Sequence, residues 1–361
     1  MNYAYLVLVV LTAHFLTACG PPPTSPAAAS QPEAGLHKLA DFPIGGAINA
    51  DRVEGDTQLL RIVRHDFNSL TATNDMKLYA IARADGPLDF SRPDAFVDFA
   101  EQQGMRVFGH TLVWHYGFPA HLEGLNEADT KTFLTNYIDT VVTRYRGRVD
   151  GWDVVNEAMA TRGGELRDTP WLQKLGREYI ALAFRAAHAA DPDAKLFIND
   201  FNTERDTAKL NGLLALVQEL RAEGVPIHGI GFQMHIRMDT DEQLIARSLA
   251  KAAETGLLVH LSEVDVIFNR HDDTQGGGEQ IVAEITPELL AAQGRKYEAL
   301  ARIYREEVPP AQRYGITFWS FTDRDTWING FFNLKDWPTP FDEARQPKPA
   351  YYGFARGLTE E

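Results

Sequence analysis

Cysteine and positive charge are both scarce in this chain of 361 residues. Cys19 is the only cysteine, so the domain that follows it has no disulfide and tolerates an oxidising compartment. The 35 basic residues against 50 acidic ones give a net charge of −15, which repels phosphate backbones and excludes nucleic acid as a partner. Beyond the N-terminus no segment is long and apolar enough to span a bilayer. A neutral polymer remains a possible partner, because the acidic field acts on it only weakly.

The N-terminus has the pattern of a targeting segment. Residues 3–16 form an apolar run of signal-peptide length, which ends in Leu16-Thr17-Ala18-Cys19-Gly20 and resembles a bacterial lipobox. We therefore expect residues 1–18 to be a lipoprotein signal peptide and Cys19 to carry the lipid, with Gly20 favouring the outer membrane. The first residues lack Lys and Arg, which leaves a plain secretion signal as the alternative. Residues 19–35, rich in Pro, Ala and Ser, predict a tether, and residues 36–361 predict one folded domain.

Eight short apolar runs alternate with helical patterns in this domain. Near-continuous apolar runs are typical of parallel strands covered on both faces, and eight strand–helix units predict a single TIM (β/α)8 barrel of the α/β class. An open doubly wound sheet is the alternative, but the first strand is not followed by a phosphate-binding glycine fingerprint. The predicted strands are residues 44–48, 69–73, 107–114, 151–156, 195–199, 227–235, 257–266 and 316–321.

Helices are expected between these strands. Asn126 is a suitable N-cap for apolar residues that recur at helical spacing as far as Tyr145. Further helices are expected over residues 179–190 and 210–223, the second of which stops at Gly224. Residues 271–279 contain three consecutive glycines and predict a flexible loop after the seventh strand.

Polar side chains gather where the apolar runs stop. Glu157 and Glu263 each lie at the end of such a run, about a hundred residues apart. In a β/α barrel the carboxyl ends of the strands form one rim, which builds the active site. Burying so many polar groups there without a function would cost stability. The other members of this set are Asn74, Lys77, His110, Trp114, His115, Asn156, Asn199, Asp200, Asn202, Gln233, His235, Asp265, Trp319, Asp323 and Trp327.

Several of these residues stand in motifs that resemble glycoside hydrolase family 10, whose members are mainly endo-β-1,4-xylanases on a β/α barrel. The resemblance covers residues 36–358. The motifs are Phe67-Asn68-Ser69-Leu70-Thr71, Asn74-Asp75-Met76-Lys77, Gly109-His110-Thr111-Leu112-Val113-Trp114-His115, Trp152-Asp153-Val154-Val155-Asn156-Glu157-Ala158, Ile198-Asn199-Asp200, Gly229-Ile230-Gly231-Phe232-Gln233-Met234-His235, Ser262-Glu263-Val264-Asp265 and, less specifically, Gln346-Pro347-Lys348-Pro349-Ala350-Tyr351-Tyr352.

The resemblance implies a retaining endo-1,4-β-xylanase that acts on xylan and xylo-oligosaccharides and needs neither cofactor nor metal. Glu157 would be the acid/base and Glu263 the nucleophile, with their carboxyl groups about 5–5.5 Å apart. The negative charge of Glu263 would keep Glu157 protonated for the first step. After Glu263 is esterified, Glu157 would lose its proton and activate water.

The resemblance also implies supporting roles. Asn156 would hold the 2-hydroxyl of the sugar that is cleaved, and Gln233 would point at the same sugar. His235 would hydrogen-bond the nucleophile while Asp265 orients its imidazole. The remaining predicted substrate-binding residues offer hydroxyl-binding groups or flat apolar faces, and they are Asn74, Lys77, His110, Trp114, Trp319 and Trp327.

Three positions depart from the family pattern. Thr73 stands where Glu is usual, Leu78 where Trp is usual and Phe201 where Tyr is usual. The first change removes a carboxylate contact on the non-reducing side, and the last removes a hydroxyl on the leaving-group side. The shorter Thr73 leaves room for a substituent on the xylose.

Three other functions stay open at this point. A carbohydrate-binding lipoprotein without activity would use the aromatic faces but would not need both glutamates. A metal-dependent barrel hydrolase would use His110, His115, His235 and Asp265, although these residues lack a tight ligand spacing. Thr73 and Leu78 also allow a retaining hydrolase of another β-linked glycan or of short xylo-oligosaccharides. We expect a monomer whose only membrane attachment is the lipid on Cys19.

Overall fold

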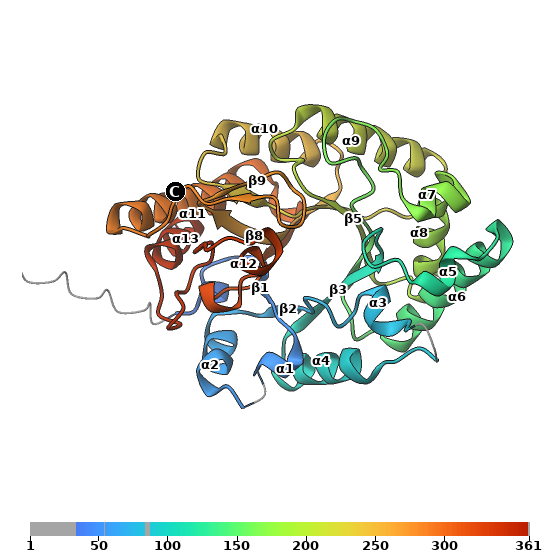
Figure 1. Cartoon of the computed structure of the whole chain (residues 1–361), viewed down its shortest axis with the longest axis horizontal. Helices are drawn as coiled ribbons and strands as arrows, with labels where there is room; N and C mark the ends of the chain where they lie inside the picture. Colours follow the sequence, from blue (N-terminus) through green and yellow to red (C-terminus); the bar gives the residue numbers. More distant parts are fainter. Residues whose placement is uncertain (1–33, 54, 84–86, 360–361) are drawn as a thin grey trace, which may run out of the picture. The chain divides into compact units, whose positions relative to one another are not determined.

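The structure, a computed structural model, describes residues 34–53, 55–83 and 87–359 (Figure 1). The predicted signal peptide at 1–18, the lipidated Cys19 and nearly all of the tether at 19–35 lie outside the described residues. In the described part of the chain, no helix combines the length and the apolar character needed to cross a bilayer.

Eight parallel strands close into a barrel, as the sequence predicts. Each strand pairs with its neighbour along the chain, and the last pairs with the first, so that no edge of the barrel is left open. The strands are β1 (Ile44–Ala47), β2 (Ser69–Thr71), β3 (Arg106–Val113), β4 (Gly151–Asn156), β5 (Lys195–Asp200), β6 (Gly229–Phe232), β8 (Leu258–Ile267) and β11 (Arg313–Phe318).

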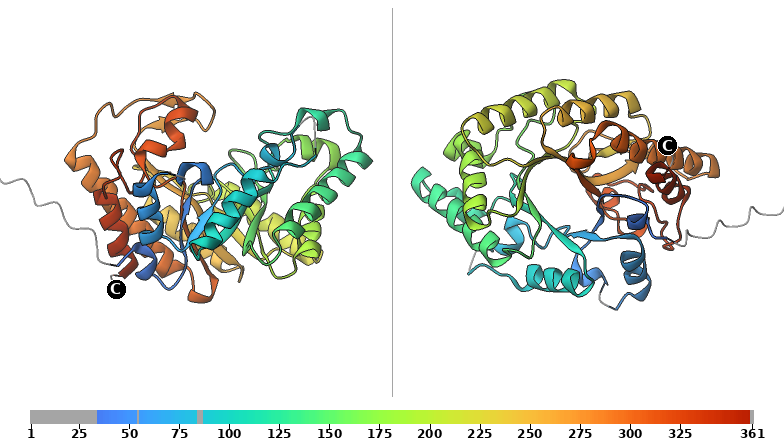
Figure 2. Two further views of the ribbon diagram at one scale, coloured as in Figure 1. Left: turned by 90° about the horizontal axis from the view of Figure 1, so that it is seen from below. Right: turned by 180° about the vertical axis from the view of Figure 1, so that it is seen from behind.

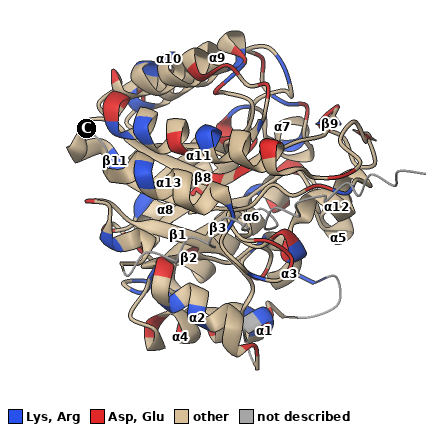
Figure 3. Ribbon diagram, turned by 90° about the vertical axis from the view of Figure 1, so that its left-hand side faces the viewer, with Lys and Arg blue, Asp and Glu red and all other residues tan. Residues whose placement is uncertain are grey.

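Helices surround the barrel, and their outer faces carry Lys and Arg mixed with Asp and Glu (Figures 2 and 3). The Asn126 side chain accepts a hydrogen bond from the Asp129 amide at the start of α6, which confirms the predicted N-cap. The longer helices are α2 (Thr57–Asp66), α4 (Ser91–Gln102), α6 (Glu127–Arg144), α8 (Glu178–Ala190), α9 (Thr207–Ala222), α10 (Glu242–Ala253), α11 (Pro287–Glu307) and α13 (Pro349–Thr359). The short helices are α1 (Ala50–Val53), α3 (Leu78–Ile81), α5 (Ala120–Glu123), α7 (Pro170–Leu175), α12 (Trp327–Phe332) and the 3-10 turns η1 (Leu36–Lys38), η2 (Pro310–Gln312) and η3 (Asp323–Asp325).

The predicted sixth strand is wrong in one respect, because residues 227–235 do not form one continuous strand. Met234 has a left-handed backbone with φ of 61°, which separates β6 from a short strand β7 (His235–Arg237). Strand β7 pairs with β8, placing His235 opposite Asp265. The eighth strand also differs from its predicted bounds, since β11 ends at Phe318 and Ser320 is left-handed with φ of 64°.

The prediction of a flexible loop over residues 271–279 is also wrong. Strands β9 (Arg270–His271) and β10 (Gly278–Glu279) pair as a small antiparallel hairpin. The His271 ring stacks on Phe332 of α12 with centroids 4.1 Å apart, so the hairpin is packed against the rest of the domain. The sequence around the glycine run does not predict this contact, because Phe332 lies some sixty residues further along the chain than His271.

Two layers of side chains fill the barrel interior. Alternate residues of a strand point to the same face, so Phe108 and His110 of β3 both face inward, as do Phe197 and Asn199 of β5. Phe108 and Phe197 form the lower layer with His260 and Tyr314, with neighbouring ring centroids 4.5–6.0 Å apart. The upper layer holds the amide and carboxyl groups of the candidate site.

Candidate active site

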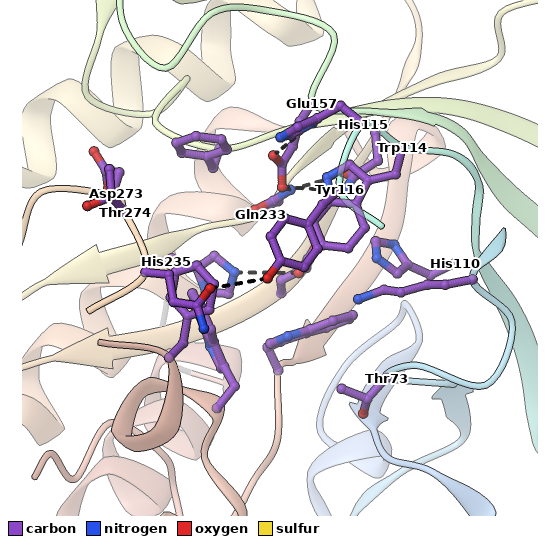
Figure 4. Close-up of a pocket in the computed structure, with 18 of the residues that line it drawn as sticks. Thr73, His110, Trp114, His115, Tyr116, Glu157, Gln233, His235, Asp273 and Thr274 are labelled. Atoms are coloured by element: carbon purple, nitrogen blue, oxygen red, sulfur yellow. Dashed lines mark hydrogen bonds and ion pairs between the residues drawn. The ribbon is translucent and has the colours of Figure 1, made fainter. Parts of the chain in front are cut away.

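A cavity of about 460 Å³ opens at the carboxyl ends of the barrel strands (Figure 4). This volume lies in the range of small-molecule sites. The rim gathers the twelve predicted catalytic and substrate-binding residues as expected, since all of them except Asp265 line the cavity. The lining members are Asn74, Lys77, His110, Trp114, Asn156, Glu157, Gln233, His235, Glu263, Trp319 and Trp327, and Asp265 lies behind His235.

Glu157 follows β4 in a strained backbone conformation, with φ of 59°. Neighbouring strands and loops hold it there: its amide donates to the Asn199 carbonyl at 2.8 Å, and Arg167 Nε donates to its carbonyl at 3.1 Å. Its carboxylate accepts from Gln233 Nε2 at 3.2 Å on one oxygen. The other oxygen faces His115 Nδ1 at 3.7 Å and an Arg167 guanidinium nitrogen at 4.0 Å.

Glu263 lies within β8 and is 4% exposed. Asn199 Nδ2 donates to one carboxylate oxygen at 2.9 Å, and His235 Nε2 lies 3.4 Å from the other. Gly231 of β6 makes this arrangement possible, because a Cβ there would lie 2.2 Å from Asn199 Oδ1. Ser262 donates to that same Asn199 oxygen at 2.7 Å and fixes the orientation of the amide.

One network of amides joins the two carboxylates. Asn156 Oδ1 accepts from Asn199 Nδ2 at 2.9 Å and from Gln233 Nε2 at 3.2 Å. Asn199 continues to Glu263, and Gln233 continues to Glu157, so both acids face the same space. Pre-oriented amides of this kind stabilise charge without reorganising during a reaction.

His235 has a carboxylate at each ring nitrogen. Glu263 lies 3.4 Å from Nε2, and Asp265 Oδ2 lies 2.9 Å from Nδ1. Trp327 Nε1 donates to that same Asp265 oxygen at 2.9 Å. Burial lowers the pKa of His235, but the carboxylates of Asp265 and Glu263 outweigh burial and raise it to about 10. The imidazole is therefore protonated at neutral pH, where a neutral tautomer would be expected without these two acids.

The Lys77 ammonium lies over the rings of two indoles. Its Nζ is 4.5 Å from the Trp114 ring centroid and 5.6 Å from that of Trp319. Burial lowers the pKa of Lys77 to about 8, although Glu263 and Glu157 act to raise it. His110 bonds Asp153 at 2.8 Å, and because burial disfavours both charges, the pKa of His110 falls and that of Asp153 rises to about 6.

Comparison with known proteins agrees with this geometry. The model of "Glycosyl hydrolase family 10" matches residues 36–356, nearly all of the described chain. The chain belongs to glycosyl hydrolase family 10. Among its relatives is endo-1,4-beta-xylanase A of Cellvibrio japonicus, 38% identical over 347 residues, which cover 90% of this chain and 56% of the relative. The chain therefore spans little more than half of that relative's length.

Two further relatives are informative. Endo-1,4-beta-xylanase B of Paenibacillus barcinonensis is 35% identical over 323 residues, covering 86% of this chain and 94% of the relative. The solved structure of xylanase10C from Cellvibrio japonicus in complex with xylopentaose superposes with a TM-score of 0.84 at 34% identity, covering 90% of this chain and 69% of that one. A TIM-barrel glycoside hydrolase domain is thereby established for this chain.

The three departures from the family pattern lie at different places. Thr73 and Phe201 line the cavity, whereas Leu78 is buried outside its lining. Tyr79 lines the cavity instead, and its hydroxyl donates to Asn74 Oδ1 at 2.8 Å. The Phe201 ring covers the buried Lys209 ammonium at 3.8 Å.

Several positions correct the expectations from sequence. Asp200 and Asp323 do not line the cavity: Asp200 pairs with Lys209 at 2.7 Å and Asp323 with Lys348 at 2.8 Å, both in buried ion pairs. His110 lies within β3 and not after it. Within residues 34–53, 55–83 and 87–359, no group of three or more His, Cys, Asp and Glu side chains is placed to hold a metal ion.

Sequence reasoning missed three residues that shape the site. Asn199 was placed on the rim without a role, yet it bonds Glu263 directly. Arg167 contacts Glu157 from a loop that carries no apolar pattern. Tyr116 lines the cavity next to the Trp114-His115 motif, and only its position directly after that motif signalled it.

Proposed function

We propose that this protein is an endo-1,4-β-xylanase that hydrolyses internal β-1,4-xylosidic bonds of xylan and retains anomeric configuration. The supporting observation is the amide network that aims Glu157 and Glu263 into one cavity. The relatives named as endo-1,4-beta-xylanases support xylan as the substrate class. Residues 36–361 would form the catalytic domain.

In the first step Glu157 donates its proton to the glycosidic oxygen while Glu263 attacks the anomeric carbon. The bond between that carbon and the leaving oxygen breaks, and an ester to Glu263 forms. Asn199 and protonated His235 each lie at one Glu263 oxygen, so they hold the carboxylate in a fixed orientation for attack. Asn156 is placed between the two acids, where its amide would meet the 2-hydroxyl of the sugar.

In the second step the ionised Glu157 takes a proton from water as the water oxygen attacks the anomeric carbon. The ester breaks, Glu263 leaves as a carboxylate, and Glu157 is again protonated. Two displacements at one carbon restore its configuration. Lys77, Asn74 and His110 would bind hydroxyls of the non-reducing side, and Trp114, Trp319 and Trp327 would offer faces to the sugar rings.

The direct test compares Glu157→Ala and Glu263→Ala with wild type on xylan. Both variants should lose nearly all turnover on xylan. On an aryl β-xyloside, whose leaving group needs no proton, added azide should restore turnover of Glu157→Ala with β-xylosyl azide as product, because azide replaces water as the attacking group in the second step. The exposed Glu165 lies on the loop that follows Glu157, and Glu165→Ala is the matched control. Unchanged xylan hydrolysis in Glu263→Ala would reject the proposal, and xylan binding without hydrolysis by wild type would favour a non-catalytic carbohydrate-binding protein.

At the non-reducing side we propose that Thr73 leaves room for a substituent on the xylose. Thr73 lines the cavity beside Asn74, and it is smaller than the Glu usual in the family. Thr73→Glu should improve activity on linear oligosaccharides relative to branched ones. Equal ratios in both proteins would remove this idea, and faster hydrolysis of mixed-linkage glucan than of xylan would favour another β-linked glycan as substrate.

We also propose that the protein is a lipoprotein of the bacterial cell envelope, attached through Cys19 to the outer membrane. The support is the lipobox-like stretch before Cys19 and the absence of any other cysteine. Incorporation of labelled palmitate in wild type but not in Cys19→Ala is the expected result. Release of unlabelled protein from wild-type cells would favour plain secretion.

A further inference from the structure

Two exposed residues meet across the mouth of the cavity. The Tyr116 hydroxyl, in the loop after β3, donates to Gln275 Oε1 at 3.4 Å. Gln275 belongs to the turn between β9 and β10, 159 residues further along the chain. Both side chains line the cavity that holds Glu157 and Glu263. Figure 4 shows the Tyr116 side chain extending from the Trp114 side of the cavity toward the His235 side.

The Gln275 end of this contact is firmly held. Asp273 accepts from Asn202 Nδ2 at 3.1 Å and from Arg205 at 3.3 Å. The Gly276 amide donates to the Phe331 carbonyl at 2.7 Å, and His271 stacks on the adjacent Phe332. These contacts fix the hairpin to α12 and to the loop after β5, so the hairpin is the stationary side of the mouth.

The Tyr116 end is held less firmly. Its ring is 48% exposed and contacts Trp114 with centroids 5.1 Å apart. Beyond that contact, its hydroxyl has one long hydrogen bond to an exposed partner. Rotation of the Tyr116 side chain would break this one hydrogen bond and open the mouth of the cavity. The hairpin that carries Gln275 would stay in place.

We propose that Tyr116 and Gln275 form a bar across the cleft that sets the preferred substrate length. This inference rests on the proposed xylanase function and deepens it. An internal segment of a long xylan chain can reach Glu157 and Glu263 only from the side, which requires an open bar. A short xylo-oligosaccharide or a chain end can enter lengthwise beneath the closed bar. The bar therefore favours short chains and chain ends, and endo cleavage occurs whenever Tyr116 swings away.

The size of the effect follows from the strength of the contact. A neutral hydrogen bond contributes about 1 kcal/mol, which corresponds to about a fivefold ratio of closed to open states. Deleting the bar should therefore raise the ratio of activity on long chains to activity on short chains by about fivefold.

The test measures kcat/KM on long linear xylan and on xylotetraose for wild type, Tyr116→Phe, Tyr116→Ala and Gln275→Ala. Tyr116→Ala should raise the polymer-to-oligomer ratio about fivefold, and the two variants that remove only the hydrogen bond should raise it less. Ile281→Ala is the control, because Ile281 is 51% exposed close to the hairpin and does not line the cavity. It should keep the wild-type ratio.

If the polymer-to-oligomer ratio of Tyr116→Ala stays the same or falls while the enzyme remains active on xylotetraose, the proposed role of the bar is rejected. The proposed function stays in place. Inactivity of wild type on both substrates overturns the proposed function, and the inference falls with it.

Discussion

The two layers inside the barrel share strands β3, β5 and β8 but have opposite chemistry. In the lower layer Phe108, Phe197 and Tyr314 surround His260, and burial lowers the pKa of that histidine well below its usual value. In the upper layer His235 lies between Asp265 and Glu263, which raise its pKa to about 10. Two buried histidines in one barrel thus differ in charge at neutral pH because only one of them has acidic neighbours.

This comparison indicates a division of labour along each strand. Phe197 and Asn199 of β5 are two residues apart and face the same interior. Phe197 contributes apolar packing, whereas the Asn199 side chain donates hydrogen bonds to Glu263 and Asn156. We therefore expect lower-layer substitutions to reduce stability and upper-layer substitutions to reduce activity.

The largest expected effect contrasts Glu263→Gln with Phe197→Ala. Glu263→Gln should lower kcat/KM on xylan by at least about 10⁴-fold, because the proposed nucleophile is lost, and change the free energy of unfolding by less than about 1 kcal/mol. Phe197→Ala should lower the free energy of unfolding by about 4 kcal/mol, because it leaves a cavity in the barrel. Assays of the folded fraction should then find near-normal kcat/KM for Phe197→Ala. Equal losses of activity per folded molecule in both variants would contradict the assignment of stability to the lower layer and activity to the upper layer.

Asn199→Ala should have the next largest effect. It removes the donor to Glu263 and to Asn156, so kcat/KM should fall by about 100-fold. Asn136→Ala, at an exposed position on α6, serves as control. An Asn199→Ala enzyme with a wild-type kcat/KM would show that the amide network does not orient the nucleophile.

Lys77→Met sharpens the comparison by separating stability from function. The pKa of Lys77 is lowered to about 8 by burial, so its charge costs stability below that pH. Lys77→Met should raise the free energy of unfolding at pH 7 by about 2 kcal/mol while raising KM for xylo-oligosaccharides. Lys131→Met, at a surface ion pair with Glu178, should change neither quantity measurably. Lower stability of Lys77→Met would show that the ammonium contributes to folding.

The last prediction concerns His235 at alkaline pH, where the change is a pH dependence of stability and not a loss of activity. Its folded pKa of about 10 exceeds the usual value of 6.5, so its favourable charge interactions are fully present below pH 6.5. They weaken above that pH and are lost as pH rises through 10. The stability difference between wild type and His235→Asn should therefore shrink between pH 7 and pH 10.5, measured by denaturant unfolding. A difference that stays constant over this range would mean that His235 is neutral in the folded protein.

Sequence reasoning predicted the strands well where an apolar run coincides with a barrel strand. Strand β4 has its predicted bounds, and β5 and β8 agree within one residue. The predictions failed where a distant contact decides the backbone. Met234 is left-handed in a run that reads as one strand, and His271 is fixed by stacking on Phe332.

The same limit applies to the site. The motifs placed Glu157 and Glu263 on one rim, since strand ends of a barrel meet there. They did not reveal that Asn199 donates a hydrogen bond to Glu263, because these residues lie 64 positions apart. The contact also depends on the absence of a side chain at Gly231, where a Cβ would collide with the Asn199 amide. The contact of Tyr116 with Gln275 was equally hidden, because it depends on how a hairpin packs.

The most direct test of the central claim, that Glu157 and Glu263 carry out a double displacement on one glycosidic bond, is the anomeric configuration of the first product. Proton NMR spectra recorded within the first moments of xylohexaose hydrolysis should detect the β-anomer at the new reducing end before mutarotation produces the α-anomer. An α-anomer as the initial product would mean that water attacks directly, and it would contradict the assignment of Glu263 as nucleophile.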